Sequence, residues 1–198
     1  MNYDFDRVDK GPLVKKIIIK TIIWMIAIVT VVFLAYFLSH NALEKTIVLG
    51  TSMESTLKEK DEVIINKYAY FISKPKRFDV IVFKQTNKEH SYLNIKRIIG
   101  LPGETIQIIN GLVYINGEAL EEIIPVENIN NSGLAGESIQ LEENEYFVLG
   151  DNRNYSEDSR FANIGNIVKD DIIGKAFARG NDFAFIDNLN RIKIKEAN

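Results

Sequence analysis

The longest apolar segment of the chain lies near its start, where residues 21–39 contain no charged side chain. A helix of about 19 residues is sufficient to cross a hydrocarbon core about 30 Å thick. The large apolar side chains of this segment surround the predicted helix and leave no polar stripe of the kind that a helix in a soluble core shows. No small-x-small cleavage site follows the segment, so we expect a retained transmembrane helix over residues 21–39.

The basic residues around this predicted helix are distributed unequally. Lys45 is the only Lys or Arg between the helix and residue 52. Basic residues near a transmembrane helix favour the cytoplasmic side. The sequence therefore predicts a single-pass protein of the cytoplasmic membrane, with residues 1–20 as a cytoplasmic N-terminal tail and residues 40–198 as a domain on the outer face. The basic residues that precede the helix are Arg7, Lys10, Lys15, Lys16 and Lys20.

Beyond residue 40, short apolar runs alternate with turn residues, a pattern typical of β-strands. The Asn110-Gly111 pair predicts a tight hairpin because both residues tolerate positive φ, and Asn116-Gly117 predicts a second turn. No helical segment alternates with these runs, so we expect a mostly β fold built on an antiparallel β-sheet. The predicted strands are Glu62–Asn66, Asp79–Lys84, Tyr92–Ile99, Thr105–Ile109, Leu112–Asn116, Tyr146–Leu149 and Asp171–Ala176.

The segment over about residues 106–145 differs from the strands around it. Residues 118–145 are largely polar, and Asn, Ser and Gly are frequent in residues 128–136. Such a composition is typical of a surface loop between core strands. We therefore expect a small β-rich insertion or cap over about residues 106–145, with a mobile polar part.

Composition argues against several classes of function. The formal net charge of -3 does not favour nucleic acid as a partner, since a strongly basic face would be needed to neutralise phosphates. The chain contains no cysteine, which excludes disulfides, thiolate nucleophiles and cysteine metal sites. His40 and His90 lack the paired spacing of a helix-borne zinc site. We therefore expect no metal and no cofactor.

Four segments are candidates for carrying the chemistry of the chain, and each alone has an ordinary explanation. The first fits a loop with an N-cap serine, and the second fits a buried strand behind a basic turn. The third fits a solvated strand that ends in a Pro-Gly turn, and the fourth fits a plain turn, since it lacks the calcium-binding pattern of an EF-hand. The segments are Gly50–Leu57, Arg77–Val82, Lys96–Glu104 and Gly150–Arg160.

Together and in this order, the four segments resemble the characteristic boxes of type I signal peptidases, the Ser-Lys enzymes that process secreted preproteins. The resemblance covers roughly residues 15–180 and includes the run Ile172–Ala176. It implies that Ser52 is the nucleophile and that Lys96 is the general base. It also implies supporting roles for residues of the Gly-Asp-Asn box: Ser156 would hydrogen-bond the lysine amine, and Asp158 and Arg160 would form an ion pair. The supporting set is Asp151, Asn152, Ser156, Asp158 and Arg160.

A lysine can act as general base only when its amine is neutral. Its ordinary pKa of about 10.4 keeps it protonated at neutral pH, so burial must lower the pKa of Lys96. Side chains alternate along a strand, which places Ile98 on the face of Lys96 and Arg97 on the opposite face. Neither histidine fits the role of base, because His40 falls at the membrane exit and His90 lies in a polar turn.

Two positions depart from the pattern of the family. Some members have a hydroxyl residue two positions before the nucleophile, where this chain has Gly50, so another group must complete the oxyanion hole. The family usually has proline where this chain has Ser55, which removes a φ restraint from the loop after the nucleophile. The aromatic run Tyr68–Ile72 fits either a piece of core or a segment that enters the outer leaflet.

The resemblance implies an endopeptidase that cleaves signal peptides from exported preproteins after small residues, with those preproteins and the lipid bilayer as partners. A second interpretation is a dedicated relative that processes pilins or other envelope proteins, which Ser55 favours. A third is a catalytically silent, membrane-tethered assembly factor on the same fold. The presence of both Ser52 and Lys96 counts against this third interpretation, because a scaffold does not need the pair.

Overall fold

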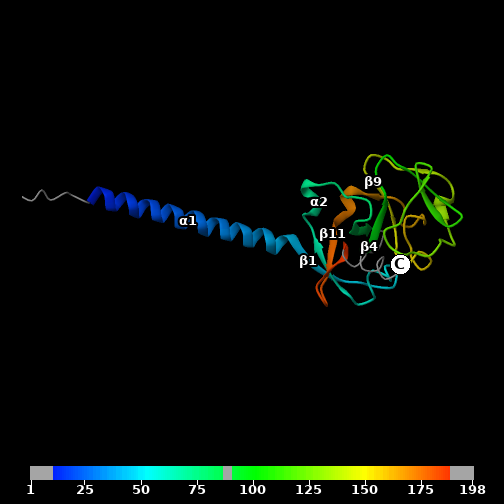
Figure 1. The fold of residues 1–198 in the computed structure, drawn as a ribbon, viewed down its shortest axis with the longest axis horizontal. Helices are drawn as coiled ribbons and strands as arrows, with labels where there is room; N and C mark the ends of the chain where they lie inside the picture. The colour runs from blue at the N-terminus through cyan, green and yellow to red at the C-terminus, as the bar shows by residue number, and fades with distance from the viewer. Residues whose placement is uncertain (1–10, 87–90, 188–198) are drawn as a thin grey trace, which may run out of the picture. The chain divides into compact units, whose positions relative to one another are not determined.

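The structure is a computed structural model that describes residues 11–86 and 91–187. The chain forms two units, a helical one up to Ala42 and a β-rich one from Leu43 onward (Figure 1). Helix α1 spans Gly11–Ala42 and therefore extends the predicted helix at both ends. Its segment Val14–Ala42 has a mean hydropathy of 2.7 and is long and apolar enough to cross a membrane.

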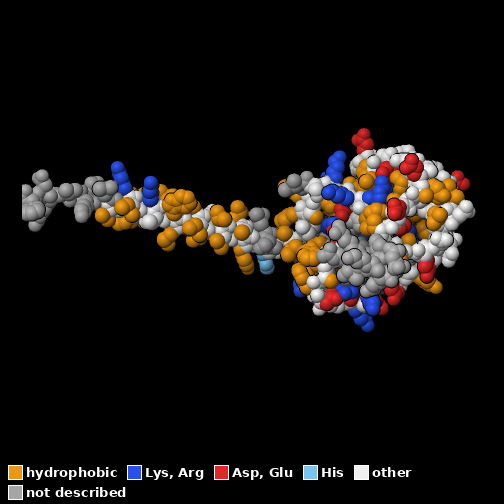
Figure 2. All heavy atoms as spheres, viewed as in Figure 1, with side chains coloured by type: hydrophobic (Ala, Val, Ile, Leu, Met, Phe, Trp, Pro, Cys, Tyr) orange, Lys and Arg blue, Asp and Glu red, His pale blue; other side chains and the backbone are white. Residues whose placement is uncertain are grey.

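Polar side chains within α1 bond to the helix itself. Thr21 Oγ1 donates to the carbonyl of Ile18 at 2.8 Å, and Thr30 Oγ1 donates to that of Ile26 at 2.8 Å. Such internal bonds satisfy hydroxyl groups where no water is available. Figure 2 shows hydrophobic side chains along most of α1, with lysines only toward its N-terminal end. This distribution is the one expected of a helix that spans a bilayer.

The β-rich unit contains two antiparallel sheets, which confirms the predicted mostly β fold. The strand order is β1-β2-β11-β3-β4-β9-β10 in the larger sheet, with β12 paired to β11, and β7-β6-β5-β8 in the smaller one. The larger sheet consists of β1 (Leu43–Ile47), β2 (Glu62–Asn66), β3 (Val80–Thr86), β4 (Ser91–Gly100), β9 (Glu145–Leu149), β10 (Ile167–Val168), β11 (Ile172–Arg179) and β12 (Ala184–Phe185). The smaller sheet consists of β5 (Thr105–Ile109), β6 (Leu112–Ile115), β7 (Glu118–Ala119) and β8 (Ile139–Gln140).

The helices of this unit are short. They are α2 (Ala69–Ile72) and two single-turn 3-10 helices, Gly133–Gly136 and Lys169–Asp171. All seven predicted strands are present, and their ends differ from the prediction by at most three residues. The predicted hairpin turns are also present, since Asn110 and Gly111 have φ of 51° and 81°. The sequence did not predict β1, which is largely exposed, or the strands that have only two residues, which are β7, β8, β10 and β12.

The core lies on both faces of the larger sheet. On β3, Val80 and Val82 face one hydrophobic cluster, and Ile81 and Phe83 face another. A strand buried on both faces loses the apolar-polar alternation of a half-exposed strand. The smaller sheet packs over a third cluster, to which β9 contributes Phe147. Strand β4 therefore contributes to all three clusters, and β9 contributes to the second and third of them.

The polar segment 128–136 packs against the rest of the domain more closely than we expected of a mobile cap. Ile129 and Ala135 are buried within the cluster under the smaller sheet. The backbone N–H of Leu134 donates to the carbonyl of Arg160 at 2.8 Å. A Cβ on Gly133 would lie 2.2 Å from the same carbonyl oxygen, so only glycine permits this approach. Sequence polarity did not reveal these contacts, because two small or apolar residues suffice to anchor the segment.

Candidate active site

Ser52 lies in the loop between β1 and β2. The loop is closed at its base, where the backbone N–H of Val48 donates to the carbonyl of Asp61 at 2.9 Å. Met53 and Leu57 are 1% and 0% exposed, and the N–H of Leu57 donates to the carbonyl of Met53 at 2.8 Å. These two buried side chains on either side of a tight turn hold the loop against the core. The backbone that carries the Ser52 hydroxyl is therefore held in place.

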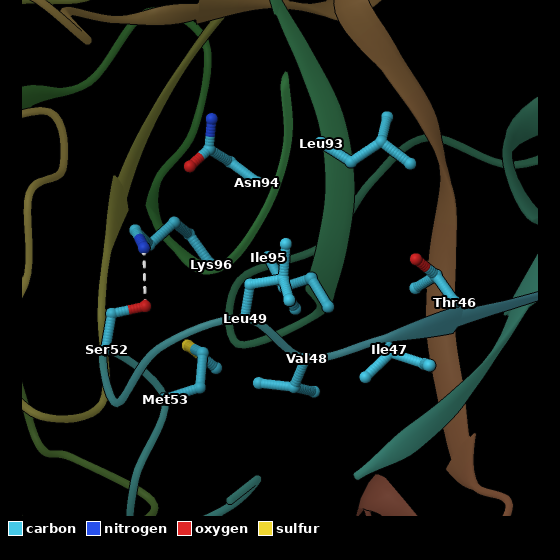
Figure 3. Close-up of a pocket in the computed structure, with 10 residues that line it drawn as sticks. All are labelled: Thr46, Ile47, Val48, Leu49, Ser52, Met53, Leu93, Asn94, Ile95 and Lys96. Atoms are coloured by element: carbon cyan, nitrogen blue, oxygen red, sulfur yellow. Dashed lines mark hydrogen bonds between the residues drawn. The ribbon is translucent and has the colours of Figure 1, made fainter. Parts of the chain in front are cut away.

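Lys96 lies on β4 and is only 4% exposed. Its partner across the sheet is Ile81 of β3, and residues directly opposite in an antiparallel pair share a face. Ile98 lies on the same face two residues further along β4. Lys96 Nζ lies 2.7 Å from Ser52 Oγ, which is hydrogen-bond distance (Figure 3). The two residues lie 44 positions apart in the sequence, so the fold brings them together.

Burial lowers the pKa of Lys96, because its surroundings disfavour the charged ammonium. The carboxylates of Asp158, Asp151 and Glu157 act in the opposite direction, and the guanidinium of Arg160 lowers the pKa further. Desolvation is the largest of these effects, so the pKa of Lys96 lies below its ordinary value and the amine loses its proton more readily than in water. A neutral lysine beside a serine hydroxyl can accept the proton of that hydroxyl.

A groove with a volume of about 300 Å³ opens beside Ser52 and Lys96. One wall comes from the end of β1 and the residues after it, and the other wall comes from the first half of β4 (Figure 3). The lining is mainly apolar, with the serine and the lysine at one end. The lining residues are Thr46, Ile47, Val48, Leu49, Ser52, Met53, Leu93, Asn94, Ile95 and Lys96.

The loop Gly150–Arg160, which follows β9, lies directly against the Ser52 loop. The backbone N–H of Asn152 donates to the carbonyl of Ser52 at 3.1 Å, and its side-chain amide donates to the carbonyl of Thr51 at 3.1 Å. A Cβ on Gly150 would lie 2.5 Å from the carbonyl oxygen of Ser52. Asn152 therefore holds the nucleophile loop from two sides, and glycine at position 150 allows the two loops to touch.

Asp158 and Arg160 form a buried ion pair, with 2.7 Å between Arg160 Nε and Asp158 Oδ1. Asp158 Oδ2 also accepts the backbone N–H of Gly150 at 3.0 Å. Arg160 Nη2 donates to the carbonyl of Arg153 at 2.6 Å. The pair thus fixes both ends of the Gly150–Arg160 loop.

The sequence profile of the family described as "Signal peptidase, peptidase S26" matches residues 21–180. The chain belongs to the signal peptidase family. The resemblance inferred from the four segments is thereby confirmed, and the family relationship makes the chain a peptidase, which is a hydrolase.

Individual relatives agree with the family match. Signal peptidase I P of Bacillus subtilis subsp. natto is 34% identical over 179 residues, which cover 87% of this chain and 92% of the relative. Signal peptidase I T of Bacillus subtilis (strain 168) is 36% identical over 159 residues, covering 76% and 80%. A crystal structure of a signal peptidase I from Enterococcus faecalis V583 is 32% identical, covers 52% of this chain and 97% of that chain, and has a TM-score of 0.40. Together with the apolar helix α1, the two Bacillus subtilis relatives suggest a single-pass membrane protein.

Ser156 of this signal peptidase lies in the loop as expected but does not make the expected contact. It is 8% exposed, and its hydroxyl has no hydrogen-bond partner among the described residues. The hydrogen bond from Ser156 to the Lys96 amine is therefore absent in this conformation. Instead, the Ser156 hydroxyl faces Gly150, where a Cβ would lie 2.2 Å from it.

Arg97 is the important residue whose role the sequence did not reveal. Its guanidinium makes two hydrogen bonds to Asp151, at 2.7 and 2.6 Å, and both side chains are 0% exposed. It also donates to the carbonyl of Phe78 at 2.9 Å and to Thr56 Oγ1 at 3.2 Å. Strand alternation had placed Arg97 on the face away from Lys96, and a buried arginine needs a carboxylate partner. That requirement is a signal by which the sequence could have indicated a carboxylate partner such as Asp151.

Ser55 has a backbone conformation that the family's usual proline does not share. Its φ is 104°, whereas proline is restricted to about -65°. Its hydroxyl is buried and has no hydrogen-bond partner among the described residues. The serine therefore does not only lack the φ restraint of proline. It allows the loop of this signal peptidase to adopt a backbone conformation that proline cannot adopt.

Exchange of Ser55 for Pro is expected to destabilise the protein by about 3 kcal/mol or more, because the ring forbids positive φ. Ser55→Gly is the matched variant, and it is expected to be at least as stable as the unchanged chain, since glycine adopts this φ freely and leaves no buried hydroxyl. Thermal unfolding followed by circular dichroism measures both. A Ser55→Pro variant as stable as Ser55→Gly would contradict the loop conformation.

No metal site is evident in the part of the chain that the structure describes, since no three His, Cys, Asp or Glu side chains gather there. His40 lies on α1, and His90 lies outside the described residues.

Proposed function

We propose that this chain is a membrane-bound serine endopeptidase that removes signal peptides from exported preproteins, with Ser52 as nucleophile and Lys96 as general base. The observation that carries the proposal is the 2.7 Å separation between Lys96 Nζ and Ser52 Oγ in a water-poor setting. A serine hydroxyl is a weak nucleophile and needs an adjacent base. Lys96 is the group in position to accept its proton.

The reaction proceeds in two stages. The neutral amine of Lys96 takes the proton of Ser52 as Oγ attacks the scissile carbonyl, and the ammonium then protonates the leaving amine. The signal peptide remains as an ester on Ser52. Lys96 next takes a proton from a water molecule that attacks this ester, and returning that proton to Ser52 Oγ releases the signal peptide as a carboxylic acid, which then ionises in water.

The developing oxyanion needs hydrogen-bond donors in a fixed position. The backbone N–H of Ser52 is the natural donor because it moves with the nucleophile. Asn152 supports it by fixing the carbonyls of Thr51 and Ser52. Gly50 has a φ of 78° and no side-chain donor, so a backbone or hydroxyl group elsewhere has to complete the oxyanion hole.

The groove fits an extended peptide. Strand β9 pairs with Arg97, Ile98 and Gly100 of β4, which leaves the first half of β4 unpaired on that side within the described residues. On the opposite wall, β1 pairs with β2 alone in the described part of the chain. A peptide strand laid between such edges gains backbone hydrogen bonds, and side-chain pockets then provide specificity. The apolar lining suits small apolar side chains before the cleaved bond, in the Ala-x-Ala-like pattern of the family.

We infer that α1 anchors the enzyme in the cytoplasmic membrane with residues 1–20 in the cytoplasm and the peptidase domain outside. Lys15, Lys16 and Lys20 lie at its N-terminal end, and the next Lys or Arg is Lys45. This asymmetry follows the positive-inside rule. Exported preproteins would meet the enzyme on the face of the bilayer from which they emerge.

A cleavage assay tests this function. The purified full chain in lipid vesicles is incubated with a preprotein, and the new N-terminus of the product is sequenced; Ser52→Ala serves as the blank. Cleavage after a small residue is expected, and a preprotein with a large residue at that position should remain uncut. Cleavage of pilins or envelope proteins alone would favour a dedicated enzyme. Binding without any cleavage would favour the assembly factor.

The pH dependence of kcat gives a second measurement. Burial lowers the pKa of Lys96 from its ordinary value of 10.5. As the pH rises, the amine should therefore lose its proton before the pH reaches 10.5. The rate is expected to fall as the pH decreases through this lowered pKa, since a protonated amine cannot accept a proton. Unfolding temperatures over the same range control for loss of structure. A rising limb centred at or above 10.5 would contradict the role of a buried Lys96.

A further inference from the structure

The Gly150–Arg160 loop is attached to the segment that connects β7 with β8. Three of its residues reach out of the loop and bond to this segment, which belongs to the smaller sheet. The contacts join Arg153 Nη1 to Glu122 Oε1 at 2.6 Å, Asn154 Nδ2 to the Asn128 carbonyl at 3.1 Å, and Arg160 Nη1 to the Asn131 carbonyl at 3.1 Å. The position of a loop beside the catalytic pair therefore depends on a segment outside the larger sheet.

Arg153 connects this segment to the catalytic residues most directly. Its side chain is 2% exposed, and its Nε donates to the carbonyl of Gly150 at 3.2 Å. The N–H of Gly150 donates to Asp158, so the glycine is held from both of its peptide groups. Gly150 packs so closely against the Ser52 carbonyl and the Ser156 hydroxyl that an added Cβ would lie 2.5 and 2.2 Å from them, so a displacement of Gly150 would be transmitted to both.

The Glu122–Arg153 pair is a poor source of stability. Arg153 Nη2 and Glu122 Oε2 are buried without hydrogen-bond partners among the described residues. A cavity of about 260 Å³ lies beside the pair, with Leu112 and Ile124 in its lining. Buried ion pairs with unsatisfied atoms gain little over apolar side chains, so the stability of the fold does not explain this pair. The bond from Arg153 Nε to the Gly150 carbonyl indicates instead that the pair positions the Gly150–Arg160 loop.

We propose that Arg153 is a positioning residue for the Ser52–Lys96 reaction and that Glu122 orients it by pairing with Nη1. The inference rests on the proposed function. Arg153 holds the carbonyl of Gly150, which keeps the loop pressed against Ser52 and Lys96. The charged groups that act on Lys96 come from this loop: Asp151, Glu157 and Asp158 favour its protonated form, and Arg160 opposes it. Loosening the loop would change both the geometry and the hydration of the lysine.

Kinetics of Glu122→Gln and Arg153→Lys test the proposal. Glu122→Gln keeps the shape of the side chain and removes its charge, and Arg153→Lys keeps the charge but loses the bond from Nε to Gly150. Each is expected to lower kcat by about tenfold with KM changed less than about twofold, because a small displacement of reacting groups slows the reaction without weakening binding. The rising limb of the pH–rate profile should also move to higher pH as water reaches Lys96.

Asp182→Asn is the matched control, because it removes the charge from an exposed ion pair with Arg179 on the hairpin β11–β12. Its kcat and pH profile should equal those of the unchanged chain. If Glu122→Gln and Arg153→Lys lower the unfolding temperature but keep the kcat and pH profile of the unchanged chain, the pair is structural only and the proposal is overturned. If the unchanged chain cleaves no preprotein, the proposed function itself fails. Should Glu122→Gln not fold, Glu122→Asp tests the same contact in another way, because it keeps the charge but shortens the reach to Arg153 Nη1, and it is expected to lower kcat as well.

Discussion

Exchange of either Ser52 or Lys96 for Ala is expected to lower kcat for preprotein cleavage by roughly a thousandfold or more. The physical reason is the 2.7 Å contact between the two side chains, through which they act as one unit. Without the amine, the hydroxyl keeps its proton, and without the hydroxyl, the amine has nothing to activate. The double variant should therefore be no slower than either single variant, which the rate of preprotein cleavage measures directly.

Lys96→Met separates this chemical effect from a loss of folding. Methionine retains most of the length of the side chain and carries no amine to desolvate, so the unfolding temperature is expected to stay the same or to rise. Lys84→Ala is the matched control, because Lys84 lies on the neighbouring strand β3 and is exposed. It should cleave at the rate of the unchanged chain. Equal cleavage by Lys96→Met and the unchanged chain would falsify the proposed role of Lys96.

Exchange of Asp151 for Ala is expected to lower the free energy of unfolding by about 3–5 kcal/mol, because it leaves the guanidinium of Arg97 buried without its carboxylate. Both side chains of this pair are 0% exposed, and two hydrogen bonds join them. The pair connects β4 to the start of the Gly150–Arg160 loop. Denaturant unfolding of the full chain in detergent measures the loss.

The double variant Arg97→Met with Asp151→Leu sharpens this test. Removing both charges leaves no unpaired ion, so the double variant is expected to lose less stability than Asp151→Ala alone. Lys45→Gln breaks an exposed pair with Glu62 and should change stability by less than about 1 kcal/mol. A loss for Asp151→Ala as small as that for Lys45→Gln would show that water or another group compensates Arg97.

Much of the fold could be predicted because its signals are local. The alternation of apolar runs and turn residues predicted the strands from Glu62–Asn66 onward, and Asn110-Gly111 predicted a hairpin whose positive φ values the structure has. Strand β1 escaped prediction because its residues are mostly exposed and show no buried period. The anchoring of segment 128–136 was not predicted for a different reason. Gly133 and Ala135 pack closely because their side chains are absent or small, and small residues give no hydrophobic signal in the sequence.

The candidate site could be predicted only in part. The four ordered segments indicated Ser52 and Lys96, but the expected bond from Ser156 to Lys96 is absent, and a rotation of one hydroxyl is not encoded in residue types. Asp151 was expected to support the site without a partner being named, and its partner is Arg97. Ser55 had been interpreted as a missing restraint, whereas its φ of 104° reveals a different path of the loop.

The sequence by itself determined the apolar helix, the antiparallel strands, the family and the two residues proposed for catalysis. The helix and the strands depend on neighbouring residues along the chain. The family and the two residues are recognised from the order of motifs in the sequence. Only the tertiary structure decided how deeply Lys96 is buried, which carboxylate neutralises Arg97 and that Glu122 reaches Arg153. The residues of each such contact lie 31 to 54 positions apart, and their distance is set by how sheets and loops pack, which no local pattern of side chains specifies.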